Sequence, residues 1–228
     1  MNIAGIQRTS TIDFPGTLAC VLFTRGCDMN CFYCHNRELL MPGEELPAAQ
    51  VHSFLEKRRG LLEGVVVSGG EPTLQPDLAG FLKLLRDMGY KVKLDTNGRR
   101  PEVIYRLCTE GLLDYCAVDW KAPEEDYGSV CACADGFEKA RQTLRILQES
   151  GIEYEARTTL YPGLTLPELL SLAAALPPLP RYRLNFFRMP EGYCAEDEMR
   201  LRKRALSPGE VKAFLPELKK RQPNVILP

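Results

Sequence analysis

The sequence predicts an α/β fold with a mainly parallel sheet, and more narrowly a partial (β/α)6 barrel with its helices on the outside. Short apolar runs rich in Val, Leu and Ile alternate along the chain with amphipathic helical patterns, in about six units. A complete (β/α)8 barrel typically needs about 250 residues, whereas this chain has 228. We therefore expect one domain over residues 1–228, built as a barrel that is open on one side.

Six segments are expected to form the parallel strands, because most are short apolar runs bounded by glycine or polar residues. They are Leu18–Thr24, Gly64–Ser68, Lys91–Asp95, Leu113–Asp119, Tyr154–Leu160 and Arg181–Phe187. Helices are expected over Pro47–Arg59, Pro76–Met88, Asp135–Glu149 and Leu166–Leu176, with another beginning at Pro101. A further helix should begin at Ser207, which suits an N-cap because Glu210 stands at the N3 position.

The loop after the first expected strand carries three cysteines in the run Cys27-Asp-Met-Asn-Cys31-Phe-Tyr-Cys34. Thiolates at this spacing can point into one pocket, where they are one short of the four that usually hold a [4Fe–4S] cluster. Three thiolates would leave one iron open, and an open coordination position distinguishes a reactive metal site from a closed structural one. We therefore expect Cys27, Cys31 and Cys34 to be metal ligands.

Three other interpretations of this loop are possible. A zinc site with His35 as fourth ligand would be strained, because His35 directly follows Cys34. Covalent haem attachment fits the C-x-x-C-H pattern of residues 31–35, but it requires export, and the N-terminus lacks a signal-peptide pattern. The third interpretation is a set of buried, inert thiols.

Composition sets the broad class of the protein. Hydrophobic residues make up 45% and charged residues 26%, and the net charge is −1. These values are ordinary for a globular protein and give no reason to expect nucleic acid or a membrane as partner. Nine cysteines without an export signal favour metal ligation or free thiols over a disulfide framework. The expected location is the cytoplasm.

Unusual polar residues follow the ends of the expected strands, which is where (β/α) barrels place reactive groups. After the cysteine loop come Gly69-Gly70-Glu71-Pro72, Asp95-Thr96-Asn97-Gly98, Asp119 with Lys121, and Arg157. Each has an ordinary explanation taken alone: glycine and Asn-Gly turns, a buried Asp–Lys pair on one strand face, and an arginine that neutralises a carboxylate. Their common position at one rim, together with the cysteine loop, favours a functional site.

The C-x3-C-x2-C spacing, with an aromatic residue before the third cysteine, resembles the radical S-adenosylmethionine (SAM) enzymes. Residues 26–36, Gly69–Pro72, Asp95–Gly98 and Asp119–Lys121 together resemble the activating enzymes of glycyl radical enzymes. The run Ser10–Gly16 is similar to the branch that activates anaerobic ribonucleoside-triphosphate reductase. The resemblance extends to about residue 163.

The resemblance implies a radical SAM type of barrel in which the three cysteines hold a [4Fe–4S] cluster that binds SAM. It implies cofactor contacts from Tyr33, Gly69, Gly70, Glu71, Asp95, Asn97, Asp119 and Lys121, and a catalytic role for Arg157 at the reaction chamber. Reductive cleavage of SAM would give a 5′-deoxyadenosyl radical, which takes hydrogen from a glycine of a partner enzyme. The implied partner is anaerobic ribonucleotide reductase, and flavodoxin or ferredoxin is the implied electron donor.

Two features depart from this resemblance. Some activases place a histidine after the sixth strand, where this chain has Phe187-Arg188-Met189-Pro190. The other departure is the presence of six cysteines outside the motif. No ferredoxin-like insertion accompanies them, and Cys131-Ala-Cys133 is too sparse for a second cluster. These six are Cys20, Cys108, Cys116, Cys131, Cys133 and Cys194.

Three rival functions remain open at this stage. The chain could be a radical SAM enzyme acting on a small molecule, with residues 188–206 covering the barrel mouth. It could activate another glycyl radical enzyme, such as pyruvate formate-lyase. It could also be an iron–sulfur electron carrier, although a carrier has no need of the Gly69–Pro72 loop. The short chain leaves little to close the barrel mouth, which favours a protein loop as substrate.

Overall fold

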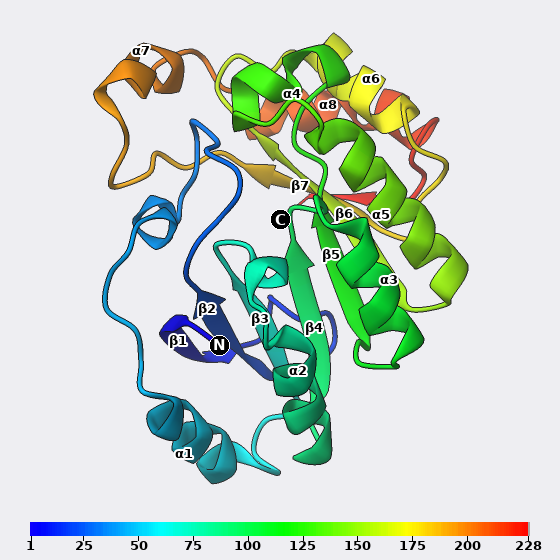
Figure 1. The fold of residues 1–228 in the computed structure, drawn as a ribbon. Helices are drawn as coiled ribbons and strands as arrows, with labels where there is room; N and C mark the ends of the chain where they lie inside the picture. The colour runs from blue at the N-terminus through cyan, green and yellow to red at the C-terminus, as the bar shows by residue number, and fades with distance from the viewer. Residues whose placement is uncertain (228) are drawn as a thin grey trace.

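The computed structural model describes residues 1–227, which form one eight-stranded sheet in the order β1 to β8 (Figure 1). The strands are β1 Ile3–Ser10, β2 Ala19–Thr24, β3 Gly64–Gly69, β4 Lys91–Thr96, β5 Tyr115–Asp119, β6 Glu153–Leu160, β7 Tyr182–Phe186 and β8 Val225–Ile226. Neighbours from β2 to β8 are parallel, and β1 pairs antiparallel with β2. The predicted α/β class, with a mainly parallel sheet, is confirmed.

The helices are α1 Ala48–Arg58, α2 Leu78–Asp87, α3 Pro101–Thr109, α4 Glu124–Cys131, α5 Gly136–Ser150, α6 Leu166–Ala174, α7 Glu198–Leu201 and α8 Pro208–Lys219. Most of them cover the outer face of the sheet, whereas the short α7 lies apart from it (Figure 1). The predicted helix start at Ser207 is confirmed in detail, because Ser207 Oγ accepts from Glu210 N–H and the Glu210 carboxylate accepts from Ser207 N–H. None of the helices described in residues 1–227 has the length and apolarity needed to cross a membrane.

Four of these strands and helices were not predicted from the sequence: β1, α4, β8 and the four-residue α7. The edge strand β1 has only Ile3 and Ser10 buried, so its sequence lacks an apolar face. Helix α4 contains Gly128 and shows little amphipathic pattern, although three acidic residues in its first turn are a favourable helix-start signal. The strand β8 has only two residues. The sheet therefore has two strands more than the six predicted. The cavity described in the next section is bordered by the six predicted strands and the loops that follow them.

The two faces of the parallel strands have different partners, because alternate side chains point to opposite sides of a sheet. In β3, Val65 and Val67 pack in the large core between sheet and helices, whereas Val66 packs in a small inner core with Phe14 and Tyr115. Each fully buried valine contributes about 1.5–3 kcal/mol. The inner core fills the barrel at the amino ends of the strands, which leaves the inner face at their carboxyl ends for polar groups.

Candidate functional site

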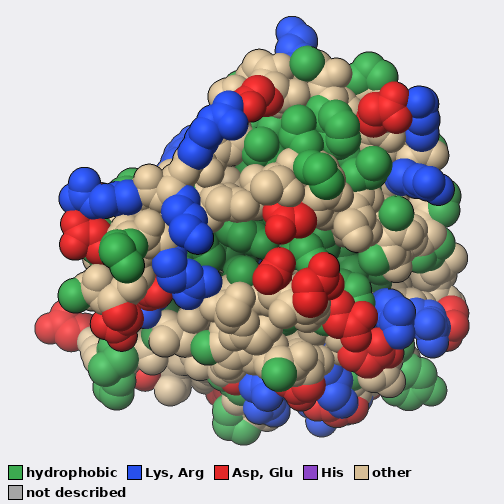
Figure 2. Space-filling model, turned by 90° about the horizontal axis from the view of Figure 1, so that it is seen from above, with side chains coloured by type: hydrophobic (Ala, Val, Ile, Leu, Met, Phe, Trp, Pro, Cys, Tyr) green, Lys and Arg blue, Asp and Glu red, His purple; other side chains and the backbone are tan. Residues whose placement is uncertain are grey.

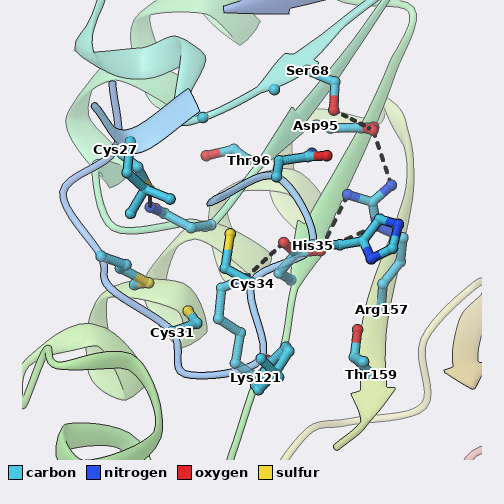
Figure 3. A pocket seen from close by; sticks show the side chains of 18 of the residues that line it. Cys27, Cys31, Cys34, His35, Ser68, Asp95, Thr96, Lys121, Arg157 and Thr159 are labelled. Atoms are coloured by element: carbon cyan, nitrogen blue, oxygen red, sulfur yellow. Dashed lines mark hydrogen bonds and ion pairs between the residues drawn. The ribbon is translucent and has the colours of Figure 1, made fainter. Parts of the chain in front are cut away.

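A cavity of about 320 Å³ lies at the carboxyl ends of the parallel strands (Figure 3). Of the residues predicted for the site, all but Glu71 line it: Cys27, Cys31, Tyr33, Cys34, Gly69, Gly70, Asp95, Asn97, Asp119, Lys121 and Arg157. The view from above shows hydrophobic and acidic side chains in the recessed centre of this face and basic side chains along one flank (Figure 2). Five strands therefore bring the predicted residues to one cavity.

The three motif cysteines border this cavity as free thiols. Within residues 1–227 they do not converge on a position for a single metal ion. Burial raises the pKa of Cys27 to about 12 and also raises the pKa of Cys34. The pKa of Cys31 is instead lowered to about 7, chiefly through the neighbouring side chain of Cys131. Three thiols around one hollow form a donor set that suits an iron–sulfur cluster.

The cysteine loop is anchored through Asp28. Its carboxylate accepts a hydrogen bond from Asn97 Nδ2 at 2.9 Å and forms ion pairs with Arg99 at 3.4 Å and Arg100 at 3.6 Å. The amide of Asn97 also lies 3.9 Å from Cys27 Sγ. Asn97, predicted as a cofactor contact, thus lines the cavity and also fixes the loop that carries the thiols. Sequence analysis did not single out Asp28, whose partners are about 70 residues away.

Gly69 and Gly70 are required by the close approach of two backbones. Gly69 has φ of 111°, and a Cβ there would lie 2.4 Å from Thr24 N. A Cβ on Gly70 would lie 2.0 Å from the carbonyl oxygen of Gly26. Two backbone hydrogen bonds hold this approach: Gly70 N–H donates to Thr24 O at 2.9 Å, and Glu71 N–H donates to Gly26 O at 2.7 Å. These glycines therefore let the Gly-Gly loop pack against the start of the cysteine loop while both border the cavity.

Glu71 lies behind the cavity rather than in its wall. Its side chain is fully buried and accepts hydrogen bonds from Thr73 N–H at 3.0 Å, Thr96 Oγ1 at 2.8 Å and Asn97 N–H at 2.7 Å. Burial raises the pKa of Glu71, and the hydrogen bonds oppose that effect. Glu71 joins the Gly-Gly loop to the end of β4 and positions Asn97, and its predicted contact with the cofactor stays a prediction.

A chain of alternating charges crosses the inner face of the barrel, and Figure 3 shows its central pair, Asp95 and Arg157. The ion pairs run from Lys93 to Asp95 at 2.7 Å, Asp95 to Arg157 at 3.0 Å, Arg157 to Asp119 at 3.1 Å and Asp119 to Lys121 at 2.9 Å. Asp119 and Arg157 are direct neighbours in the β5–β6 register. The network therefore fixes two carboxylates and two cavity-lining cations in one row.

The buried charges of this network hold one another ionised. Burial by itself raises the pKa of Asp95, but Arg157 and Lys93 outweigh it and lower that pKa to about 2. Burial opposes ionisation of Asp119 as well, but Lys121 and Arg157 outweigh it and lower its pKa. Lys93 is only 1% exposed and was missed by sequence analysis. Its position two residues before Asp95 is the same spacing that singled out Asp119 and Lys121.

Tyr33 lines the cavity from an aromatic cluster under the cysteine loop. Its ring stacks on Tyr161 with centroids 5.3 Å apart, and both rings meet Phe32 edge-on. The guanidinium of Arg200 lies 4.0 Å from the centre of the Phe32 ring. Tyr33 is therefore held rigidly at the cavity wall.

The segment after β7 flanks the cavity. Phe187 and Arg188 line it, in the region that departs from the family resemblance. Farther along, Arg37 in the short helix η1 (Arg37–Leu40) donates to Cys194 Sγ at 2.8 Å and pairs with Asp197 at 3.5 Å. In Figure 1 this orange segment runs beside the blue cysteine loop. Within the described chain, no residue of 189–206 lines the cavity.

Comparisons with known proteins agree with this geometry. The profile described as "Radical SAM superfamily" matches residues 21–176. A Methanocaldococcus jannaschii protein with the provisional name glycyl-radical enzyme activating enzyme is 33% identical over 201 residues, which are 85% of this chain and 83% of that protein. A pyruvate formate-lyase-activating enzyme of Clostridium pasteurianum is 31% identical over 174 residues, 72% of this chain and 70% of that enzyme.

Solved structures share the fold. Streptococcus suis SuiB superposes with a TM-score of 0.68 at 14% identity, over 91% of this chain and 48% of that chain. Methylornithine synthase gives a TM-score of 0.67 at 16% identity, over 92% of this chain and 64% of that chain. This chain thus spans less than two thirds of either solved structure, and the likeness concerns their shared α/β architecture.

Proposed function

Because the chain is a member of the radical SAM superfamily, we propose that it is the activating enzyme of a glycyl radical enzyme. Members of the superfamily bind a [4Fe–4S] cluster and SAM, which together supply a 5′-deoxyadenosyl radical. The observation that carries the proposal is the joint position of three free thiols and a row of fixed charges around one cavity. Two relatives that are more than 30% identical bear activase names.

The residues present fit both cofactors. Cys27, Cys31 and Cys34 would hold the cluster. SAM carries a carboxylate, an ammonium and a sulfonium, so a wall with fixed charges of both signs suits it. We assign SAM binding to the other predicted cofactor residues that line the cavity, which are Tyr33, Gly69, Gly70, Asp95, Asn97, Asp119 and Lys121.

Arg157 has a more specific role in this proposal. It lines the cavity while pairing with Asp95 at 3.0 Å and Asp119 at 3.1 Å. These contacts combine the two predictions made for it, namely a position at the reaction chamber and neutralisation of carboxylates. We infer that Arg157 fixes both carboxylates at the edge of the chamber, and its direct catalytic role remains a prediction.

The kind of substrate follows from the mouth of the cavity. Residues 189–206 do not line the cavity. This segment instead contacts the cysteine loop and η1, because Arg37 donates to Cys194 Sγ and Arg200 lies over the Phe32 ring. We place the extended loop of another protein at the recessed centre of the face in Figure 2. We therefore favour a glycine in a mobile loop of a partner enzyme over a small molecule, and an electron carrier would have no use for the charged wall.

Anaerobic ribonucleotide reductase is our first candidate for the partner, because Ser10–Gly16 resembles that branch. This run lies at the opposite end of the barrel from the cavity: Ser10 Oγ accepts from Asp13 N–H at 3.1 Å, and Phe14 packs on Tyr115. It therefore supports the branch through resemblance and makes no contribution to the cavity. Pyruvate formate-lyase is the second candidate, favoured by the 31% identity to the C. pasteurianum activating enzyme.

The test is anaerobic reconstitution followed by incubation with SAM, a flavodoxin or ferredoxin reducing system and each candidate partner separately. We expect a doublet glycyl radical signal by electron paramagnetic resonance with one partner. Cys31→Ala should give neither a full cluster nor the signal, whereas Cys20→Ala, which removes a buried thiol from β2, should give both. Full cluster content and SAM cleavage in Cys31→Ala would refute the assigned ligands.

A further inference from the structure

Exposed apolar side chains gather on two segments beside the cavity. Within residues 1–227, seven large hydrophobic side chains are exposed, and four of them stand either directly after η1 or in the segment after β7. Single exposed hydrophobic residues are ordinary, whereas a group of them marks an interaction site. We call these four residues the entrance surface, and they are Met41, Met189, Tyr193 and Met199.

The two segments that carry the entrance surface are joined by Arg37. Met41 directly follows η1, and Arg37 of η1 donates to Cys194 Sγ at 2.8 Å. Arg37 also pairs with Asp197 at 3.5 Å, and Tyr193 directly precedes Cys194. In Figure 1 the orange segment after β7 lies beside η1 on the same flank of the molecule. The exposed side chains therefore belong to one region of the surface.

Arg25 fixes the backbone that carries Met41. Its guanidinium donates to the carbonyl oxygens of Glu38, Met41 and Glu44 at 2.9, 2.8 and 3.0 Å. The Met41 side chain is nevertheless 66% exposed. A partner that binds here meets a loop that is already ordered, which lowers the entropic cost of binding.

The segment after β7 is anchored in a similar way. Pro190 is buried and follows the exposed Met189 directly. In α7, Arg200 donates to Ser129 O at 2.9 Å, and its neighbour Met199 is 82% exposed. The chain on this side of the cavity thus also presents apolar side chains from an anchored backbone.

The entrance surface continues the wall of the cavity. Leu40 and Arg188 line the cavity, and Met41 and Met189 are the next residues in the chain. A polypeptide that reaches into the cavity from solvent therefore passes next to these two methionines. Methionine side chains are flexible and adapt to different partners, and Met and Tyr are enriched at protein–protein interfaces. Position and composition together favour a polypeptide that enters the cavity as the occupant.

We propose that the entrance surface binds the apolar residues that flank the glycine in the mobile loop of the partner enzyme. The inference rests on the proposed function and deepens it, because it assigns recognition of the partner to particular residues. None of the four residues lines the cavity. Their role is to hold the loop while its glycine reaches the reaction chamber.

The test measures the dissociation constant between the anaerobically reconstituted protein and each purified candidate partner, anaerobic ribonucleotide reductase and pyruvate formate-lyase. The variants are Met189→Ser, Met199→Ser and the double variant. Leu61→Ser and Tyr105→Ser are matched controls, because these side chains are 63% and 61% exposed but lie outside the entrance surface. Iron and sulfide content and the thermal unfolding midpoint establish that each variant is loaded and folded.

We expect each single substitution to raise the dissociation constant about threefold and the double substitution about tenfold, for the partner that receives the glycyl radical. Leu61→Ser and Tyr105→Ser should bind as the wild type does. Unchanged affinity in the double variant, or an equal loss of affinity in the two control variants, overturns the proposal.

Two other occupants of the entrance surface have readouts of their own. A wild-type dimer that dissociates in the double variant, measured by analytical ultracentrifugation, would assign the surface to a second copy of this chain. Slower reduction of the cluster by flavodoxin in the double variant would assign it to the electron donor. Either result, with unchanged affinity for the partner enzyme, overturns the proposal.

These measurements separate the inference from the activase proposal. A glycyl radical on a partner that binds wild type and double variant equally removes the role of the entrance surface and leaves the activase assignment intact. A candidate enzyme that binds the double variant more weakly but acquires no radical keeps the docking surface and removes the activase assignment. If neither candidate binds or receives a radical, both fail together.

Discussion

Replacing Asp95 with asparagine tests whether the charge network stabilises the fold. Asp95 pairs with Lys93 at 2.7 Å and Arg157 at 3.0 Å, and its side chain is 11% exposed. Its pKa falls from 3.8 to about 2 in the folded protein. Because the folded pKa is depressed, the carboxylate stabilises the fold above pH 3.8, and this contribution is lost as the pH falls through 2.

The pKa difference sets the expected magnitude. A shift from 3.8 to about 2 corresponds to about 2.4 kcal/mol at pH 7 and about 1.3 kcal/mol at pH 3. Asparagine resembles the protonated acid, so Asp95→Asn should lose about this free energy of unfolding. The loss should be larger, about 3–5 kcal/mol at neutral pH, if the buried Lys93 is left without compensation.

The assay is urea unfolding of the cluster-free protein between pH 3 and pH 7. The matched control is Asp87→Asn, because Asp87 pairs with Lys83 on the exposed face of α2 at 3.3 Å. Such exposed pairs contribute about 0–1 kcal/mol. A loss of stability in Asp95→Asn that is the same at pH 3 and pH 7, or no larger than that of Asp87→Asn, would show that the network does not stabilise the fold through the ionised Asp95.

Three further substitutions probe the site. Lys121→Ala should weaken SAM binding measured by calorimetry. It should change the unfolding temperature little, because Asp119 keeps Arg157 as a second cationic partner. A large loss of stability with unaltered SAM affinity would indicate that Lys121 and Asp119 form a structural ion pair. Ala132 has φ of 53°, a conformation that glycine adopts without strain. Ala132→Gly should therefore raise the free energy of unfolding of the cluster-free protein in urea by about 0.5–1 kcal/mol. A destabilised variant would contradict this. Gly70→Ala should reduce cluster content on reconstitution, because its Cβ would lie 2.0 Å from Gly26 O; full loading would show that the loop adjusts freely.

Local sequence patterns were sufficient to predict those parts of the candidate site in which the residues stand close together in the chain. The three cysteines are confined to eight residues, and Asp119 and Lys121 face the same side because strands alternate with period two. In the structure Lys121 Nζ lies 2.9 Å from Asp119. The ends of parallel strands meet at one edge of the sheet, so the topology alone placed these groups together.

Contacts between distant segments could not be predicted in this way. Glu71 resembles a cavity residue in sequence, but it is buried because Thr96 and the Asn97 backbone turn towards it from β4. Cys131 stands 100 positions after Cys31, and nothing in the Cys-Ala-Cys pattern indicates that α4 ends against the cysteine loop. Helix α4 itself was missed, so the hydrogen bonds that Asn30 N–H and Phe32 N–H donate to the carbonyl oxygens of Cys131 and Val130 could not be foreseen.

The most direct test of the proposed activase function follows the hydrogen atom that is removed. The partner reductase is prepared with deuterium on the glycine Cα and incubated anaerobically with the reconstituted protein, SAM and a reductant. We expect the 5′-deoxyadenosine isolated from the reaction to carry one deuterium per glycyl radical formed. If 5′-deoxyadenosine accumulates without deuterium from any candidate partner, while a labelled small metabolite donates it, the activase assignment is contradicted and the small-molecule alternative is supported.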